Sequence, residues 1–412
     1  MRIIVKFKIH LFLSSILIFF SGPLAWGFEI SSFLKTRVEY FTKDNQNGGN
    51  YKDWGTLLLL DTKIEKELCE KINISLNPLF QTGNLGYTHG ILKDWGNEDR
   101  HKSCATLKEG YLELKIAHRL YMGGGIKTFL WGVCEGLNPT NFTPKDWVDV
   151  INSDDIGVPS AWIHTGLPGG FYAEGLVFNF VPSKLPLEVK NRWRIGALNG
   201  WDVKNPDTNN KEQFAARIGG SWLWGDLSFV YFEGESNYPE MKIIFPFIMK
   251  PEYFSLKKFG FNIITDFFGF TFTGEAAYNK QGKNQDDYIL WGTGIDRNWS
   301  FTDKSFYVLI EYIREHVVTH GPDPGQKYDL RRIFKNTLTG KIDLSIDSWI
   351  FEVKGAVNLY DNDFYIQPRV SFVLNDEYEF SLGYDHLAGS SESFFGIYKE
   401  NKRFFGEIKS YF

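Results

Sequence analysis

The chain is poor in cysteine and has no long apolar run after its first 27 residues. Its 412 residues include three cysteines, and an odd number excludes complete pairing within one chain. A membrane-spanning helix needs roughly 20 apolar residues, whereas the most apolar later stretch, 243–249, is short and contains Pro246. The sequence therefore predicts no helical membrane anchor.

Enzyme motifs and an excess of basic residues are also missing. The sequence contains no G-x-S-x-G, no H-E-x-x-H and no P-loop lysine. His316 and His320 are four residues apart, which is about 13 Å along a strand and too far to share one metal ion. The formal net charge is -5, and it becomes -8 without residues 1–27, which carry three basic and no acidic residues. We therefore expect no enzyme activity, no cofactor, no metal site and no nucleic-acid partner.

The first 27 residues have the order of a secretory signal peptide. Basic residues precede an apolar run at 11–20, and Ala25 and Gly27 supply small residues where a signal peptidase cleaves. We therefore predict an exported protein with one domain, residues 28–412, after removal of residues 1–27.

A period of two is the main pattern in the rest of the chain. Aromatic residues make up 17%, glycines number 40, and the mean hydropathy is -0.26. Membrane barrels show this mixture because their strands face lipid on one side and water on the other. In the last ten residues, one alternating set is apolar or small and the other is charged and aromatic. The two sets are Phe404, Gly406, Ile408, Ser410 and Phe412, and Arg403, Phe405, Glu407, Lys409 and Tyr411.

Alternating segments separated by turn signals predict about 18 strands, with 16 as the alternative count. Their boundaries are expected to shift by a few residues. The predicted strands lie near 28–41, 54–65, 72–80, 107–117, 119–134, 159–167, 171–182, 212–223, 226–235, 258–268, 269–280, 287–301, 305–318, 330–344, 347–360, 363–375, 377–388 and 402–412.

Short turns and long connections alternate along the chain, with 361–362 as the exception. A soluble sandwich has no reason to sort its loops by length onto two ends, whereas a membrane barrel does. In hydrocarbon each unpaired backbone group costs several kcal/mol, so the strand near 402–412 must pair with the strand near 28–41. We therefore predict an all-β fold, a closed antiparallel transmembrane β-barrel. The long connections are 84–106, 135–158, 183–211, 236–257, 319–329 and 389–401.

Two segments resemble parts of Gram-negative outer-membrane proteins. The final strand, which ends in Phe412, resembles the closing strand of outer-membrane β-barrels, where the terminal aromatic residue belongs to the assembly signal. Segment 131–149, with the pattern WG…NPTNFTP…D, resembles uncharacterised porin-like and alginate-export-like outer-membrane proteins. The resemblance implies an outer-membrane location, short periplasmic turns and long extracellular loops. It also implies contact with outer-membrane lipid and lipopolysaccharide and recognition by the barrel-assembly machinery, and it leaves a homo-oligomer open.

A barrel of about 18 strands is too wide for side chains to fill, so we expect a water-filled lumen with charged walls. The predicted function is a porin-like channel for passive or weakly selective diffusion of small hydrophilic solutes. One alternative is an export or uptake barrel for an anionic polymer or oligosaccharide, with Arg37, Arg217 and Arg369 in single file. Another alternative is an outer-membrane enzyme or adhesion scaffold. The pore-lining candidates are Lys35, Arg37, Asp61, Lys63, Glu109, Glu113, Arg217, Glu275, Arg297, Glu352, Lys354, Arg369 and Glu407.

Segment 135–158 interrupts the alternation with turn-forming residues. Such a loop either folds inward and narrows the pore or covers the barrel from outside, and the sequence leaves both open. Its aspartates between Asp146 and Asp155 offer oxygens to Ca²⁺, but their spacing matches no EF-hand, and a solvated acidic loop is the preferred interpretation. The constriction candidates are Asn138, Asn141, Lys145, Asp146 and Asp149.

The predicted hairpin of strands 107–117 and 119–134 leads to one further expectation. Cys104 and Cys134 lie at nearly equal distances from its turn at His118, so they are expected to face each other. Export permits a disulfide there, and the bridge would contribute roughly 3–4 kcal/mol in the chain-entropy model. The alternative is that the thiols are unrelated.

Overall fold

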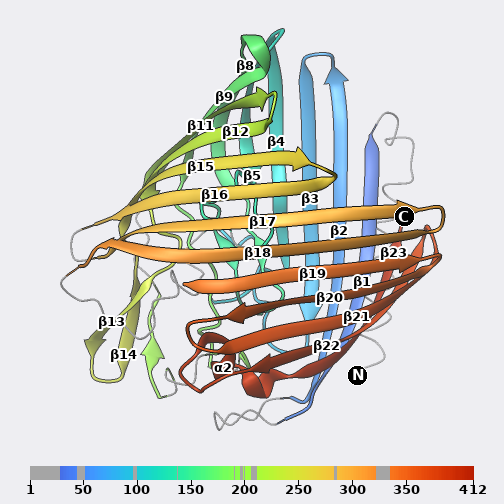
Figure 1. Ribbon diagram of the computed structural model, residues 1–412. Helices are drawn as coiled ribbons and strands as arrows, with labels where there is room; N and C mark the ends of the chain where they lie inside the picture. The colour runs from blue at the N-terminus through green and yellow to red at the C-terminus, as the bar shows by residue number, and fades with distance from the viewer. Residues whose placement is uncertain are drawn as a thin grey trace.

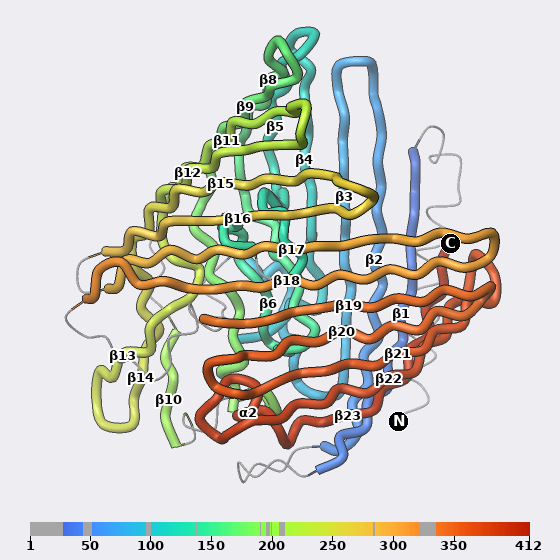
Figure 2. The backbone as a smooth tube through the Cα atoms, viewed as in Figure 1, coloured from blue at the N-terminus to red at the C-terminus, as the bar shows by residue number. Residues whose placement is uncertain are grey.

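The structure, a computed structural model, is a closed barrel of 18 antiparallel strands (Figures 1 and 2). Its helices are short, and none among the described residues is long and apolar enough to cross a membrane. The structure describes residues 28–43, 52–95, 100–136, 138–189, 191–194, 198, 200–205, 211–282, 285–321 and 335–412.

Every strand predicted from the alternation is present in the barrel wall, and the count is 18 rather than 16. The wall strands are β1 (Glu29–Phe41), β2 (Trp54–Cys69), β3 (Ile72–Gly83), β4 (Ala105–Ala117), β5 (Leu120–Lys127), β8 (Val158–Gly166), β9 (Phe171–Asn179), β11 (Glu212–Trp222), β12 (Gly225–Glu235), β15 (Ser255–Phe267), β16 (Phe270–Gln281), β17 (Asp287–Phe301), β18 (Lys304–Thr319), β19 (Asn336–Ile346), β20 (Trp349–Asn358), β21 (Asp363–Asn375), β22 (Tyr378–Ala388) and β23 (Arg403–Tyr411).

The long connections carry additional short elements. Strands β10, β13 and β14 form a three-stranded sheet outside the wall, and β6 pairs with β7. The short helices lie in the β8–β9 turn and in the connection before the last strand. The bounds are β6 (Lys145–Asp146), β7 (Asp154–Asp155), β10 (Asp202–Val203), β13 (Glu240–Phe245), β14 (Ile248–Glu252), η2 (Pro168–Gly170), α2 (Phe394–Ile397) and η5 (Lys399–Asn401).

The first and last strands close the cylinder. β1 pairs antiparallel with β2 on one side and with β23 on the other, and Arg37 lies opposite Glu407 in the β1–β23 register. This pairing confirms the predicted closure. Short turns lie at one end of the barrel, and the tightest use left-handed backbone, as at Phe268 (φ 50°) and Gly269 (φ 74°) between β15 and β16.

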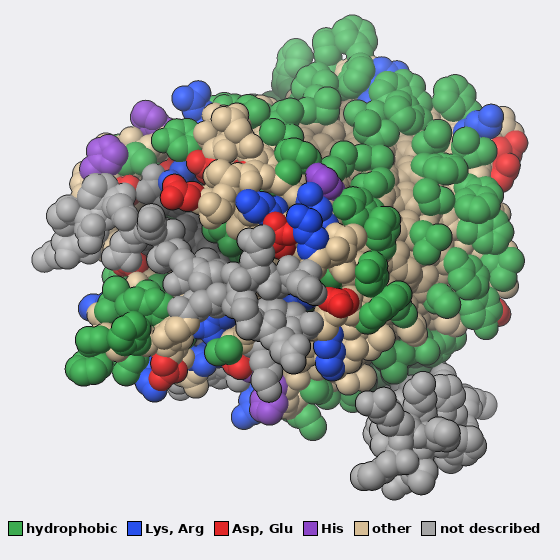
Figure 3. Space-filling view, turned by 90° about the horizontal axis from the view of Figure 1, so that it is seen from below, with side chains coloured by type: hydrophobic (Ala, Val, Ile, Leu, Met, Phe, Trp, Pro, Cys, Tyr) green, Lys and Arg blue, Asp and Glu red, His purple; other side chains and the backbone are tan. Residues whose placement is uncertain are grey.

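The alternation gives the wall an apolar outer face and a polar inner face. On β1, Val38 and Tyr40 are 41% and 40% exposed, whereas Arg37 and Glu39 are buried in the interior. Large hydrophobic side chains cover much of the outer wall in Figure 3. A sheet closed on itself pairs all its backbone groups, so this apolar surface carries no open edge.

One predicted strand is too long. The strand expected at 119–134 ends at Lys127, because β5 pairs with β8 only as far as Val158. The chain then leaves the wall and enters the barrel as the inner loop, of which the structure describes residues 128–136 and 138–157. Phe129 and Trp131 continue the alternation in the sequence, but both are buried inside the barrel.

Two buried apolar clusters organise the interior and the long-loop end. The first packs the inner loop against the inner faces of β8, β9, β11, β12 and β15, with Phe142 stacked on Phe232 at 5.3 Å. The second, here called the cap, joins residues from several long connections around Trp193, which has no exposed surface. Met241 and Met249 attach the three-stranded sheet to the cap. The described part of the long-loop end is therefore a packed layer.

Candidate functional site

Strand alternation places all but one of the predicted pore-lining residues on the inner face. Most of these charges have partners of opposite sign there. Arg37 lies 2.9 Å from Glu407, and Asp61 lies 3.2 Å from Lys108 on β4. The residues on the inner face are Lys35, Arg37, Asp61, Lys63, Glu109, Glu113, Arg217, Glu275, Glu352, Lys354, Arg369 and Glu407.

The prediction for Arg297 is wrong, because this residue faces outward. Gly294 lies on the inner face, opposite Glu311. Arg297 is an odd number of residues further along the strand, and because successive residues alternate between the two faces, it lies on the outer face. Its guanidinium lies over the rings of Phe270 and Trp299, at 4.5 and 4.9 Å. A long cationic side chain among aromatic rings near a strand end is typical of a belt at a membrane interface.

Two wall carboxylates accept hydrogen bonds from the inner loop. Glu275 on β16 accepts from the N–H groups of Val133 and Cys134, at 2.9 and 3.1 Å, and from the N–H and hydroxyl of Thr140. Glu311 on β18 accepts from the N–H groups of residues 135 and 136, each at 2.7 Å. Charge-assisted hydrogen bonds of this kind are roughly twice as strong as neutral ones. The loop therefore reaches wall strands far from β5, where it begins.

Two residues of β15 hold the same loop by its carbonyl groups. The Lys258 ammonium donates to the carbonyl oxygens of Pro139 and Asn141, at 2.8 and 2.5 Å. The Asn262 amide donates to the carbonyl oxygen of Trp131 at 2.8 Å. Lys258, Asn262 and Glu311 are not among the site residues predicted from the sequence. The signal in the sequence is a polar residue on the inner side of an otherwise apolar strand.

A buried charge cluster fixes the far part of the inner loop to the barrel seam, the place where β1 pairs with β23. Arg403 on β23 donates to Asp149 at 2.8 Å, to Glu39 at 3.0 Å and to Asp385 at 2.6 Å. Arg37 donates to Glu39 at 2.6 Å and to Glu407 at 2.9 Å. The buried charge cluster consists of Arg37, Glu39, Asp149, Asp385, Arg403 and Glu407, all of them buried. The alternation predicts Arg403 on the charged face of its strand, but Arg403 is not among the predicted site residues.

The other constriction candidates also have local partners. Asn141 accepts from the N–H of Thr143 through its side chain, and Asn138 lies against Gly132. Lys145 pairs with Asp155 at 3.7 Å, and Asp146 pairs with Lys102, a cation outside the inner loop, at 3.8 Å. Among the described residues, no group of three or more histidine, cysteine or acidic side chains is arranged to hold a metal ion.

The pKa values of two loop aspartates predict how acid affects the docking of the loop. Burial opposes ionisation of Asp149, but the charge and hydrogen bonds of Arg403 outweigh it and hold the pKa well below its usual range. A depressed pKa stabilises the folded state above about pH 4, and the contribution is lost only as the pH falls toward the folded value. Burial raises the pKa of Asp146, and a raised pKa favours the folded state as the pH falls.

Neither aspartate therefore favours release of the loop in mild acid. We expect single-channel conductance in planar bilayers to stay unchanged between pH 7 and pH 5. A stepwise rise in conductance within this range would contradict this account of the docking.

The predicted disulfide is absent, and all three cysteines are free thiols. Cys104 lies just before β4 and donates its N–H to the carbonyl of Gly90. Cys134 lies in the inner loop, near Gly292 on β17, because the hairpin register ends at Lys127. The two cysteines therefore lie in different parts of the barrel and do not face each other, contrary to the prediction.

Thiol labelling of the folded protein should separate the cysteines. Cys69 is exposed at the β2–β3 turn, whereas Cys134 is buried. Burial, with Glu275 and Glu311 nearby, raises the pKa of the Cys134 thiol well above its usual range, and only the thiolate reacts readily. We expect intact-mass analysis to show one maleimide on Cys69, none on Cys134 without denaturant, and no mass change from reduction alone.

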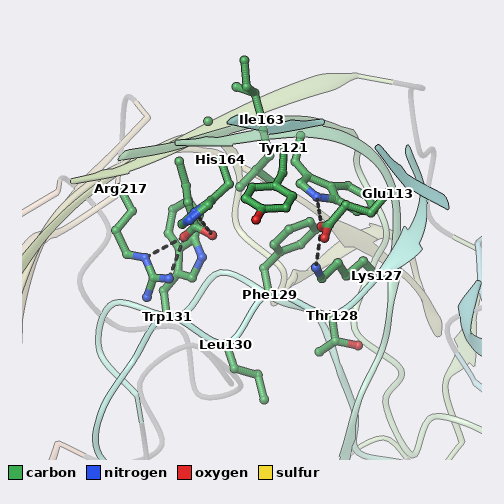
Figure 4. A pocket seen from close by; sticks show the side chains of 14 residues that line it. Glu113, Tyr121, Lys127, Thr128, Phe129, Leu130, Trp131, Ile163, His164 and Arg217 are labelled. Carbon is green, nitrogen blue, oxygen red and sulfur yellow. Dashed lines mark hydrogen bonds and ion pairs between the residues drawn. The ribbon is translucent and has the colours of Figure 1, made fainter. Parts of the chain in front are cut away.

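A cavity of about 420 Å³ lies between the barrel wall and the start of the inner loop, toward the end of the barrel with the short turns; Figure 4 shows the side chains that line it. Here it is called the turn-side cavity. The inner faces of β4, β5, β8, β9 and β11 form its wall, and loop residues 128–131 form its floor. Its charged residues are Glu113, Lys127, Glu174 and Arg217, and His164 also lines it. Two of them, Glu113 and Arg217, are predicted pore-lining residues, so the structure brings these two together around one space.

No protein-family model matches the sequence, and a search of curated proteins finds no match. Solved structures with a similar fold include OprB of Pseudomonas putida, at 10% identity and a TM-score of 0.49, covering 94% of this chain and 95% of that one. OccK11 (OpdR) of Pseudomonas aeruginosa is similar at 9% identity and a TM-score of 0.47, with 93% and 94% covered. OmpF of Salmonella typhi, in complex with daunomycin, is similar at 9% identity and a TM-score of 0.46, with 93% and 97% covered. Identities and TM-scores this low leave the activity of the chain to be argued from its own residues.

Proposed function

We propose that this protein is an outer-membrane channel through which small hydrophilic solutes diffuse passively. The proposal rests on one observation: the closed sheet has an apolar outer face and a polar inner face. The outer face exposes large apolar side chains, and the inner face carries charged residues on β1, β16, β20 and β21. A cylinder with this polarity suits a bilayer outside and water inside.

The inner loop is proposed to narrow the path and set the size of the solutes that pass. Its hydrogen bonds to Glu275 and Glu311 on one side, and to Arg403 on another, support this role because they hold the loop across the interior. A loop held by several charged wall residues is a fixed obstacle. Sieving by pore diameter requires no chemistry and no energy source.

The ion preference of the channel is proposed to be weak. Inner-wall charges occur largely as opposite pairs, such as Arg369 with Glu379 at 3.0 Å and Lys341 with Asp343 at 2.7 Å. Paired charges leave little net field for either sign of ion. In planar bilayers with a salt gradient, we expect a cation-to-anion permeability ratio within roughly threefold of unity. Absence of any stepwise current from folded protein would overturn the channel itself.

An anionic polymer is less well supported as the substrate. That alternative needs a file of cations free to bind the polymer. Instead, Arg37 and Arg369 both contact Glu407, and Arg217 is bonded to Glu174 on β9. Each of the three arginines therefore lies beside a carboxylate that would repel a polyanion, so the pore offers a mixed surface in place of a continuous basic track.

A further inference from the structure

We propose that the turn-side cavity binds a small zwitterionic solute with an apolar portion, the class of an apolar α-amino acid. This inference rests on the proposed channel function, because it gives the channel a site at which a passing solute pauses. The volume of about 420 Å³ lies within the range of small-molecule sites and holds such a solute with some water.

Two cations face each other across this cavity, with the Tyr121 hydroxyl directed between them (Figure 4). Arg217 donates through Nε and Nη2 to Glu174, at 2.9 and 2.6 Å. Within the described part of the chain, its Nη1 donates no hydrogen bond. A guanidinium is a fork of five donors, so this arginine has capacity left for a carboxylate.

Lys127 has fewer polar contacts than Arg217. Its nearest carboxylate, Glu113, is 4.0 Å away, beyond hydrogen-bond distance. Its ammonium lies over the rings of Trp162 and Tyr111, at 4.7 and 4.8 Å. Among the described residues it makes no hydrogen bond, although an ammonium has three donors. The Glu113–Lys127 pair is therefore loose, and Glu113, which accepts one hydrogen bond from the Trp162 indole at 3.2 Å, has acceptor capacity left for a charged group.

The balance of charges decides the class of ligand. Each side of the cavity pairs one permanent cation with one carboxylate: Arg217 with Glu174, which also lies 3.3 Å from Nδ1 of His164, and Lys127 with Glu113. A simple anion would approach two carboxylates, and a simple cation would approach two basic groups, so both meet repulsion. A zwitterion matches both signs, with its carboxylate at Arg217 and its ammonium at Glu113.

The rest of the lining fits an apolar portion of the solute. Phe129, Trp162 and Leu176 present aromatic and aliphatic surface to the same space. An uncharged polyol would leave these surfaces and the loose ion pair without matching groups. The cavity therefore favours an amino acid with an apolar side chain over a neutral sugar.

Isothermal titration calorimetry on the full-length protein in detergent tests this inference with four probes. Phenylalanine is the zwitterion, N-acetylphenylalanine the anion, phenylalaninamide the cation and glucose the neutral polyol. We expect phenylalanine to bind at least tenfold more tightly than each of the others, because only it satisfies both signs of charge. Equal or tighter binding of any other probe, or no binding of phenylalanine, overturns the proposal.

Glu113→Gln removes the carboxylate proposed for the ammonium group, and Glu379→Gln is the matched control on β22, outside the cavity. Phenylalanine affinity should fall at least tenfold in the first variant and change less than twofold in the second. Lys127→Met serves in place of Glu113→Gln if that variant does not fold, and it should also weaken binding. Unchanged affinity in the folded variant overturns the site. Binding without ion current would overturn only the channel, and current without binding would overturn only this inference.

Discussion

Replacing residues 138–149 of the inner loop by a short Gly-Ser linker is expected to raise single-channel conductance at least about twofold. The replacement removes Thr140, which bonds to Glu275, and Asp149, which bonds to Arg403. It also removes the carbonyl groups that accept from Lys258. Without these bonds nothing fixes the middle of the loop in the interior, and the path widens. Conductance is read from unitary current steps in planar bilayers.

The barrel should survive this replacement. Arg403, Glu275 and Lys258 lose partners, but water enters the vacated space and hydrates them, which limits the cost of unpaired charge. Shortening the exposed tip of the β13–β14 hairpin at 243–247 is the matched control, because it removes exposed residues such as Ile244 (50% exposed) and Phe247 (69% exposed). The control should leave conductance unchanged. Equal conductance in the loop variant and the natural protein would remove the inner loop from the path.

The wall could be predicted from the sequence because one local rule applies along all of it. Outer and inner faces alternate on every strand, and the turns at one end are short, so each strand is visible without its neighbours. Arg297 shows where the rule fails. A cation in an outer aromatic belt and a cation in the lumen have the same sequence pattern, and only the strand register separates them.

The interior could be predicted only in part because its contacts join distant segments. The interruption at 135–158 and the wall position of Glu275 could be predicted. Glu311 and Lys258 could not, because they contact the inner loop more than a hundred residues away in sequence. Such contacts depend on which wall strand stands opposite β5, and that depends on the circumference of the whole barrel.

The cysteine prediction failed for a related reason. Phe129 and Trp131 extend the period of two past the end of β5, so the hairpin looked longer than it is. Both pack into the interior cluster around Phe142. A buried loop and a half-buried strand can therefore share one pattern over a few residues, and tertiary packing decides between them.

Replacing Arg403 by methionine is expected to destabilise the folded barrel by roughly 3–5 kcal/mol, the range typical of removing one partner from a buried ion pair. Arg403 has no exposed surface and bonds to Asp149, Glu39 and Asp385. Methionine fills much of the volume but leaves three buried carboxylates near one another, with Arg37 as the nearest cation of the cluster. Unfolding in denaturant, followed by the loss of the compact form on electrophoresis, measures the change.

Two further variants separate lost charge pairing from lost packing. Arg119→Met changes an exposed arginine in the β4–β5 turn in the same way, and it should cost less than about 1 kcal/mol. Adding Asp149→Asn to Arg403→Met removes one stranded carboxylate, so the double variant should be more stable than Arg403→Met alone. If the two are equally stable, the cost at Arg403 comes from packing at the seam. If the double variant recovers stability, the charge of Asp149 is what Arg403 neutralises, and the inner loop and the barrel seam fold as one coupled unit.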